Sequence, residues 1–143
     1  MKPAFKPVLV VLGMVALMAA FTLIRHATEP NDAVPWRKDL QTAKQEGAAA
    51  HKPVFAYFTA PWCGYCQDMH RQTWPDPRVA DALKDFVPVK IDVDAFPDVA
   101  RQFQVQGIPR MQLIQADGSA GPARVGFTTA DELIRWLRGR GNE

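Results

Sequence analysis

The sequence predicts an α/β domain in which helices cover both faces of a mixed central β-sheet, preceded by a membrane anchor. The chain has 143 residues, of which 48% are hydrophobic, enough for one compact domain and a short additional segment. Apolar runs of strand length alternate with segments of helical spacing in its first half, which predicts parallel strands. A turn signal at Asp117-Gly118 lies between two later runs, which predicts an antiparallel hairpin. Together these patterns favour a mixed sheet.

The N-terminal residues 1–26 have the pattern of a signal anchor or transmembrane segment. Lys2 and Lys6 precede residues 8–24, a run of 17 residues without a charged side chain. A run of about 17–25 residues can cross a bilayer. Cleavage sites carry small residues in an Ala-x-Ala pattern, which Leu17 and Met18 interrupt. We therefore expect a retained anchor, and a cleaved export signal is the alternative.

The charge distribution predicts the orientation of the chain and excludes one class of partner. The positively charged N-terminal residues before the apolar run favour the cytoplasm, which places residues 25–143 on the other side of the membrane. In a bacterium residues 25–143 would then lie in the periplasm, on a single-pass inner-membrane anchor. Lys2 and Lys6 account for the net charge of +2, so the remainder of the chain is neutral. A neutral domain lacks the basic face of a nucleic-acid-binding protein, and no nucleic-acid partner is expected.

Residues 27–35 are polar, contain two prolines, and are predicted to be a linker to a domain of residues 36–143. The apolar spacing of residues 36–46 predicts a helix that ends at Gly47. The continuous apolar run 54–58 predicts a central strand buried on both faces. The elements expected next are helix 67–72, a short helix from Asp76-Pro77, strand 87–93, helix 97–103, strand 111–114 and strand 124–127. Thr129 and Glu132 form a capping-box pattern that predicts a final helix over 130–138.

The two cysteines, Cys63 and Cys66, are three positions apart and cannot connect distant segments of the chain. They therefore indicate redox chemistry or metal binding. They follow the predicted strand directly and open a helix, where unpaired N–H groups and the helix dipole favour an anion. Because the thiolate is the nucleophile in disulfide exchange, we predict Cys63 as the attacking residue. Cys66, one helical turn further on, is predicted to resolve the mixed disulfide.

The segment Trp62-Cys63-Gly64-Tyr65-Cys66 after an apolar strand resembles the thioredoxin superfamily, as does Gly107-Ile108-Pro109. The resemblance covers about residues 36–140. It is closest to exported thioredoxin-like proteins and to the C-terminal domain of the transmembrane thiol–disulfide interchange reductase. It implies a thioredoxin fold with a cis peptide bond at Pro109 facing the dithiol. The implied substrate-binding residues are Trp62, Gly64, Tyr65, Ile108 and Pro109.

The resemblance also implies an activity. The expected protein is a thiol–disulfide oxidoreductase, more specifically a protein-disulfide reductase acting on exported proteins. Its redox group would be the Cys63–Cys66 pair itself, so neither a bound cofactor nor a metal is expected. Its partners would be protein disulfides and a thiol electron donor, such as a membrane reductase.

The sequence departs from the thioredoxin pattern at a buried Asp that serves there as a proton carrier. Tyr57 stands in that place, six residues before Cys63. Lys90 matches a lysine of the family and is a candidate for tuning the pKa of the site. Without its usual carboxylate partner, Lys90 would pair with Asp92 or Asp68.

Metal binding is the alternative function. Cys63, Cys66, Met69 and His70 combine thiolate, thioether and imidazole groups, which suit Cu(I). This pattern would belong to a periplasmic copper-binding or copper-delivery protein. A redox-inert binding module is the third hypothesis, and it would not need both cysteines.

Overall fold

The computed structural model describes Met14, Met18 and residues 32–139. Within these residues lies a four-stranded sheet in the order β2-β1-β3-β4, in which β1 and β2 are parallel and the other neighbours are antiparallel. The strands are β1 (Val54–Thr59), β2 (Val87–Asp92), β3 (Arg110–Ile114) and β4 (Ala120–Val125). The predicted mixed sheet is therefore confirmed.

The predicted anchor of residues 1–26 lies, except for Met14 and Met18, outside the described residues. Among the residues that are described, none of the helices has the length and apolar character required to cross a membrane.

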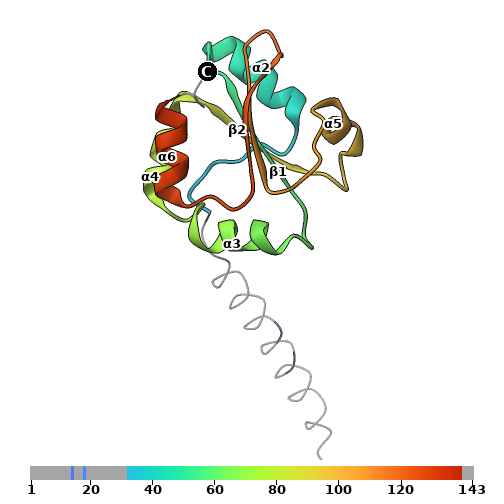
Figure 1. Cartoon of the computed structure of the whole chain (residues 1–143), viewed down its shortest axis with the longest axis vertical. Helices are drawn as coiled ribbons and strands as arrows, with labels where there is room; N and C mark the ends of the chain where they lie inside the picture. The colour runs from blue at the N-terminus through green and yellow to red at the C-terminus, as the bar shows by residue number, and fades with distance from the viewer. Residues whose placement is uncertain (1–13, 15–17, 19–31, 140–143) are drawn as a thin grey trace, which may run out of the picture. The chain divides into compact units, whose positions relative to one another are not determined.

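Helices cover both faces of the sheet (Figure 1). They are α2 (Leu40–Ala50), α3 (Gly64–Gln72), α4 (Pro77–Ala82), the 3₁₀ turn η1 (Leu83–Asp85), α5 (Pro97–Gln102) and α6 (Ala130–Arg138). Alternate residues of a strand point to opposite faces. Phe55 and Tyr57 of β1 accordingly pack with α3, α4 and α6, while Ala56 and Phe58 pack with α2 and α5. The strand at the centre of the sheet is thus buried on both faces, as its apolar run predicts.

An aromatic cluster fills the core on the α4/α6 face and lies directly behind the cysteine-bearing helix. Trp74, which is fully buried just beyond α3, packs edge-on against Tyr57 with ring centroids 4.7 Å apart. Trp36 contacts Trp74 in the same way at 5.0 Å. These contacts place the end of α3 against β1, so the aromatic core sets where the helix lies on the sheet.

The first helix differs from its prediction at both ends. Helix α2 begins at Leu40, because Asp39 caps it by accepting hydrogen bonds from the backbone N–H groups of Gln41 and Thr42. Gly47 does not end the helix but lies inside it. A Cβ at Gly47 would lie 2.7 Å from the carbonyl oxygen of Lys52, so glycine is needed there for close approach of two backbone segments.

The hairpin forms where the sequence predicts it, but its second strand starts earlier than expected. Gly118 adopts a φ of 84°, and the backbone N–H of Gln115 donates to the carbonyl of Ser119. This tight turn returns the chain to β3 at once, so pairing begins at Ala120 rather than at Arg124.

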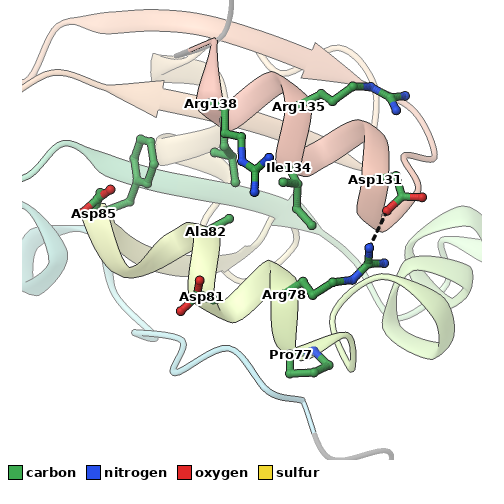
Figure 2. A pocket seen from close by; sticks show the side chains of 11 residues that line it. Pro77, Arg78, Asp81, Ala82, Asp85, Asp131, Ile134, Arg135 and Arg138 are labelled. Atoms are coloured by element: carbon green, nitrogen blue, oxygen red, sulfur yellow. Dashed lines mark ion pairs between the residues drawn. The ribbon is translucent and has the colours of Figure 1, made fainter.

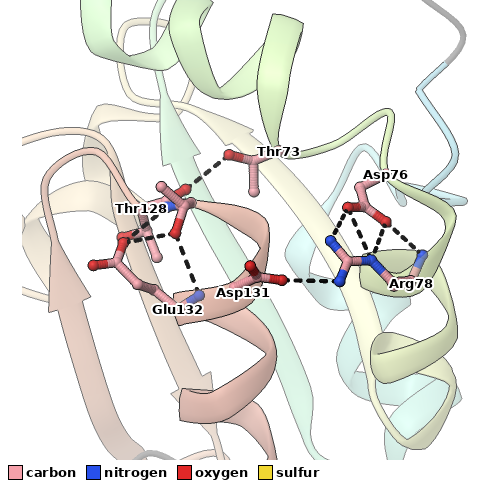
Figure 3. Close-up of polar contacts among 7 residues, drawn as sticks. Thr73, Asp76, Arg78, Thr128, Asp131 and Glu132 are labelled. Atoms are coloured by element: carbon pink, nitrogen blue, oxygen red, sulfur yellow. Dashed lines mark hydrogen bonds and ion pairs between the residues drawn. The ribbon is translucent and has the colours of Figure 1, made fainter.

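The capping box of α6 is confirmed (Figure 3). Oγ1 of Thr129 accepts from the N–H of Glu132 at 3.3 Å, and the Glu132 carboxylate accepts from the N–H of Thr129 at 3.0 Å. This backbone hydrogen bond holds the pKa of Glu132 below its ordinary value. The preceding carbonyl of Thr128 accepts from the Thr73 hydroxyl at 2.7 Å, which links α6 to the end of α3.

Replacing Thr129 by alanine is expected to lower the free energy of unfolding by about 1 kcal/mol, because an N–H at the helix start loses its acceptor. Urea unfolding followed by circular dichroism measures the change. Thr129→Ser keeps the hydroxyl and serves as the control. Equal stability of the alanine and serine variants would contradict the capping argument.

Candidate active site

The two cysteines lie at the beginning of α3 and form a disulfide, with their Cα atoms 5.2 Å apart. Cys63 is the N-cap residue, and its Sγ accepts a hydrogen bond from the backbone N–H of Cys66 at 3.2 Å. In the reduced protein the same N–H would stabilise a thiolate at Cys63. The local geometry therefore suits Cys63 as the nucleophile.

The residues between and beside the cysteines leave the disulfide open to a partner. Trp62 and Tyr65 are 67% and 66% exposed, although the Cys63 side chain itself is buried. The Trp62 indole N–H donates to Asp94 at 2.7 Å, which holds the ring in place. A Cβ at Gly64 would meet no atom within 4 Å. The approach to the dithiol is therefore unobstructed at this position.

A segment distant in sequence completes this surface. The Ile108–Pro109 peptide bond is cis, as the resemblance implies. Ile108 packs against the cluster of Ala60, Cys63 and Cys66. The fold thus brings residues 62–66 and 108–109 together beside the disulfide.

The structure corrects the expectation for the carboxylate partner of Lys90. The partner is Asp32, whose Oδ2 accepts from Lys90 Nζ at 3.1 Å and from the Trp36 indole N–H at 2.7 Å. Asp92 instead accepts from the N–H of Asp94, and Asp68 pairs with Arg71. Asp32 lies in the stretch predicted as a linker, and the buried Val34 follows it. Sequence reasoning missed Asp32 because the contact with Lys90 spans 58 positions and leaves no local pattern.

A pocket of about 430 Å³ lies on the inner side of the dithiol and includes Cys66 in its wall. Tyr57, His70, Trp74 and Lys90 also line it. Burial raises the pKa of Tyr57, so a neutral hydroxyl stands where thioredoxin has a carboxylate. Neither that hydroxyl nor the Trp74 indole N–H makes a hydrogen bond of ordinary geometry, although the side chains of Thr59 and Trp74 lie beside the hydroxyl. Both polar atoms are enclosed by protein and are inaccessible to solvent in this structure.

A larger groove of about 800 Å³ lies between α4 and α6 and contains none of the predicted site residues (Figure 2). Arg78 and Asp131 form an ion pair across it at 2.9 Å. The dithiol and its pocket therefore form the candidate active site, although the groove is the larger cavity.

The potential copper ligands do not come together as one set. Met69 is fully buried in the core cluster on the α4/α6 face, whereas Cys63 and Cys66 form a cluster of their own. Among the described residues, no group of three or more His, Cys, Asp or Glu side chains is arranged to hold a metal ion.

The sequence profile of the thioredoxin-like domain family matches residues 37–140. The chain belongs to this family. The predicted membership of the thioredoxin superfamily is therefore confirmed.

Relatives of the thioredoxin-like domain include the thiol:disulfide interchange protein DsbD. The Salmonella paratyphi A protein is 41% identical over 126 residues, which cover 84% of this chain and 20% of that protein. The Ralstonia nicotianae protein is 35% identical over 105 residues, covering 70% of this chain and 17% of that protein. The chain thus spans about a fifth of the length of these relatives.

A solved structure supports the assignment of the chain to the thioredoxin-like domain family. The reduced C-terminal domain of DsbD from Neisseria meningitidis superimposes with a TM-score of 0.60 at 29% identity, covering 68% of this chain and 90% of that one. Rabbit (Oryctolagus cuniculus) protein disulfide-isomerase is 30% identical over 119 residues, 80% of this chain and 22% of that protein. The family, these relatives and the Cys63–Cys66 disulfide identify the protein as an oxidoreductase of the thiol–disulfide class.

Proposed function

We propose that the protein reduces disulfide bonds in exported proteins through its Cys-Gly-Tyr-Cys dithiol. The disulfide at the start of α3, with Cys63 as N-cap beside the cis Ile108–Pro109 bond, is the observation that carries this proposal. Similarity to the C-terminal domain of DsbD, which has been solved in both reduced and oxidised forms, supports a dithiol that cycles between these two states. Tyr65 adds no positive charge next to the cysteines, which favours a moderate reductant over a strong oxidant.

The two cysteines carry the electrons in this reaction. The Cys63 thiolate attacks one sulfur of the substrate disulfide, and the other substrate sulfur leaves as a thiolate that takes a proton. Cys66 then attacks Sγ of Cys63 and releases the second substrate sulfur. The substrate gains two electrons, and the cysteines lose two as their disulfide forms. A thiol electron donor must reduce this disulfide before the next turnover, and we propose a membrane reductase for that role.

The substrate chain would dock on an apolar surface around the dithiol. Within residues 32–139, the exposed large hydrophobic side chains are Trp62, Tyr65, Phe96 and Val125. Phe96 lines the same pocket as Cys66. Val125 lies beside the cis-proline segment, because the N–H of the next residue, Gly126, donates to the Pro109 carbonyl at 2.8 Å. An extended apolar segment of a protein substrate fits this surface.

Residues 1–26 would hold the catalytic domain at the periplasmic face of the inner membrane. Lys2 and Lys6, which precede an uncharged run of 17 residues, support this part of the proposal. A protease added to spheroplasts should degrade the domain while the membrane stays intact. Protection from the protease would contradict the proposed orientation, and recovery of the domain in the soluble periplasmic fraction would indicate a cleaved signal.

The equilibrium reduction potential tests the proposed direction. We expect the full chain in detergent to have a potential near the thioredoxin value of about −270 mV when equilibrated with glutathione buffers. The fluorescence of Trp62, adjacent to Cys63, provides the readout. A value near about −120 mV would indicate an oxidant and contradict the reductase proposal.

A further inference from the structure

His70 is placed to exchange a proton with Cys66. The two residues are four positions apart on α3, and side chains with this spacing lie on the same face with Cβ atoms about 5–6 Å apart. Both line the pocket on the inner side of the dithiol. His70 is 37% exposed, so a proton that it accepts can pass on to solvent.

Asp32 holds a carboxylate against the imidazole. Its Oδ2 lies 3.9 Å from Nδ1 of His70, close enough for an electrostatic attraction but not for a hydrogen bond. The N–H of Val34 donates to Oδ1 at 3.3 Å, while Trp36 and Lys90 donate to Oδ2. With both oxygens engaged, the carboxylate has a defined position from which to orient the ring and stabilise an imidazolium.

The pocket that Cys66 and His70 both line has room for water. Water in this pocket would connect the two groups if they are not in direct contact. The other titratable groups of the pocket wall and of the elements around His70 are Asp32, Lys38, Tyr57, Asp68, Arg71, Lys90 and Asp92.

The remaining groups are less suited to accept the proton. The amino group of Lys90 is engaged as a donor to Asp32. The Tyr57 hydroxyl stays neutral. Asp92 uses Oδ1 to accept from the N–H groups of Asp94 and Ala95, and it lies on β2 rather than on the helix of Cys66. Asp92 is nevertheless the main competitor, since it is a carboxylate in the same pocket wall.

We infer that His70 accepts the proton of Cys66 in the resolving step, and that Asp32 is a positioning residue that orients the imidazole. The Cys66 thiol transfers its proton to the imidazole of His70, directly or through a pocket water. Its sulfur then forms a bond with Sγ of Cys63 while the bond from Cys63 to the substrate sulfur breaks. That sulfur leaves with the electron pair as a thiolate and takes a proton from solvent or from the imidazolium.

Rapid mixing of the reduced full-length protein with glutathione disulfide tests this inference. Acid quenching and mass spectrometry give the amount of mixed disulfide and hence the rate of the resolving step. At pH 7 we expect His70→Gln to slow this step about tenfold or more, with the mixed disulfide accumulating. We expect Asp32→Asn to slow it about threefold, because the imidazole is retained but loses its orienting carboxylate.

The pH profile separates proton transfer from a structural effect. At higher pH solvent hydroxide can take the Cys66 proton, so the slowing caused by His70→Gln should be smaller at pH 9.5 than at pH 7. His51→Asn provides the matched control, because His51 is an exposed histidine at the end of α2 and outside the pocket. Its resolving rate should equal that of the unmodified protein at every pH.

Three results would overturn the inference. These are an unchanged resolving rate in His70→Gln at pH 7, a slowing of equal size at pH 7 and pH 9.5, and accumulation of mixed disulfide in Asp92→Asn instead. The inference rests on the dithiol chemistry proposed above but not on the client, because glutathione disulfide is the oxidant. If Cys66→Ala formed no mixed disulfide, the proposed dithiol function would be overturned as well. The three results above concern only the role of His70.

Discussion

Replacing Cys63 by serine is expected to lower the rate of protein-disulfide reduction by about a thousandfold or more, to the uncatalysed level. A serine hydroxyl does not ionise near neutral pH, so the N–H of Cys66 and the start of α3 have no thiolate to stabilise. Reduction of insulin with dithiothreitol as electron donor, followed by turbidity, measures the loss.

The matched variant Cys66→Ser separates the two cysteines. It should keep the first attack but arrest turnover as a mixed disulfide between Cys63 and the substrate, visible on a non-reducing gel. The order of the roles would be reversed if Cys63→Ser trapped the substrate and Cys66→Ser did not. Substantial turnover by both variants would exclude dithiol chemistry altogether.

Phe55→Ala is expected to have the largest effect on stability, lowering the free energy of unfolding by about 3–5 kcal/mol. Phe55 is fully buried in the central strand, and its ring centroid lies 6.1, 6.3 and 6.5 Å from those of Trp36, Trp74 and Trp136. Removing the ring leaves a cavity among three indoles that cannot move without displacing α6 and the end of α3. Urea unfolding followed by far-ultraviolet circular dichroism gives the change.

An exposed apolar residue provides the control for this experiment. Val125 is 56% exposed on the last strand, and Val125→Ala should change the stability by less than about 0.5 kcal/mol. A loss below about 1 kcal/mol in Phe55→Ala would contradict the central place of Phe55 in the aromatic core. Loss of activity in Val125→Ala at unchanged stability would support the apolar docking surface.

The elements predicted most accurately are those whose signals are local. The capping box at Thr129 predicts the bounds of α6 over 130–138, because both of its hydrogen bonds join residues three positions apart. The apolar run after Pro53 predicts β1 as a central strand, because such a run can only be buried on both faces. The spacing of Cys63 and Cys66 likewise places both sulfur atoms at one helix start.

Predictions that needed distant partners were less accurate. Gly47 has a local pattern typical of a helix end, but the helix continues through it. Glycine is needed there because the Lys52 carbonyl oxygen lies close to its Cα. The start of β4 depends on how tightly the turn at Gly118 returns the chain to β3. In both cases the competing interaction is absent from the local sequence.

The sequence by itself therefore determined the order of the elements, the mixed sheet and the reactive pair, since periodicity, capping and cysteine spacing act over a few residues. Only the tertiary structure decided what surrounds Cys66. It brings Asp32 to Lys90 across 58 positions, places Nδ1 of His70 3.9 Å from the same carboxylate, and encloses the Tyr57 hydroxyl in protein. Such contacts are set by the packing of strands and helices against one another, and no short-range pattern in the sequence encodes them.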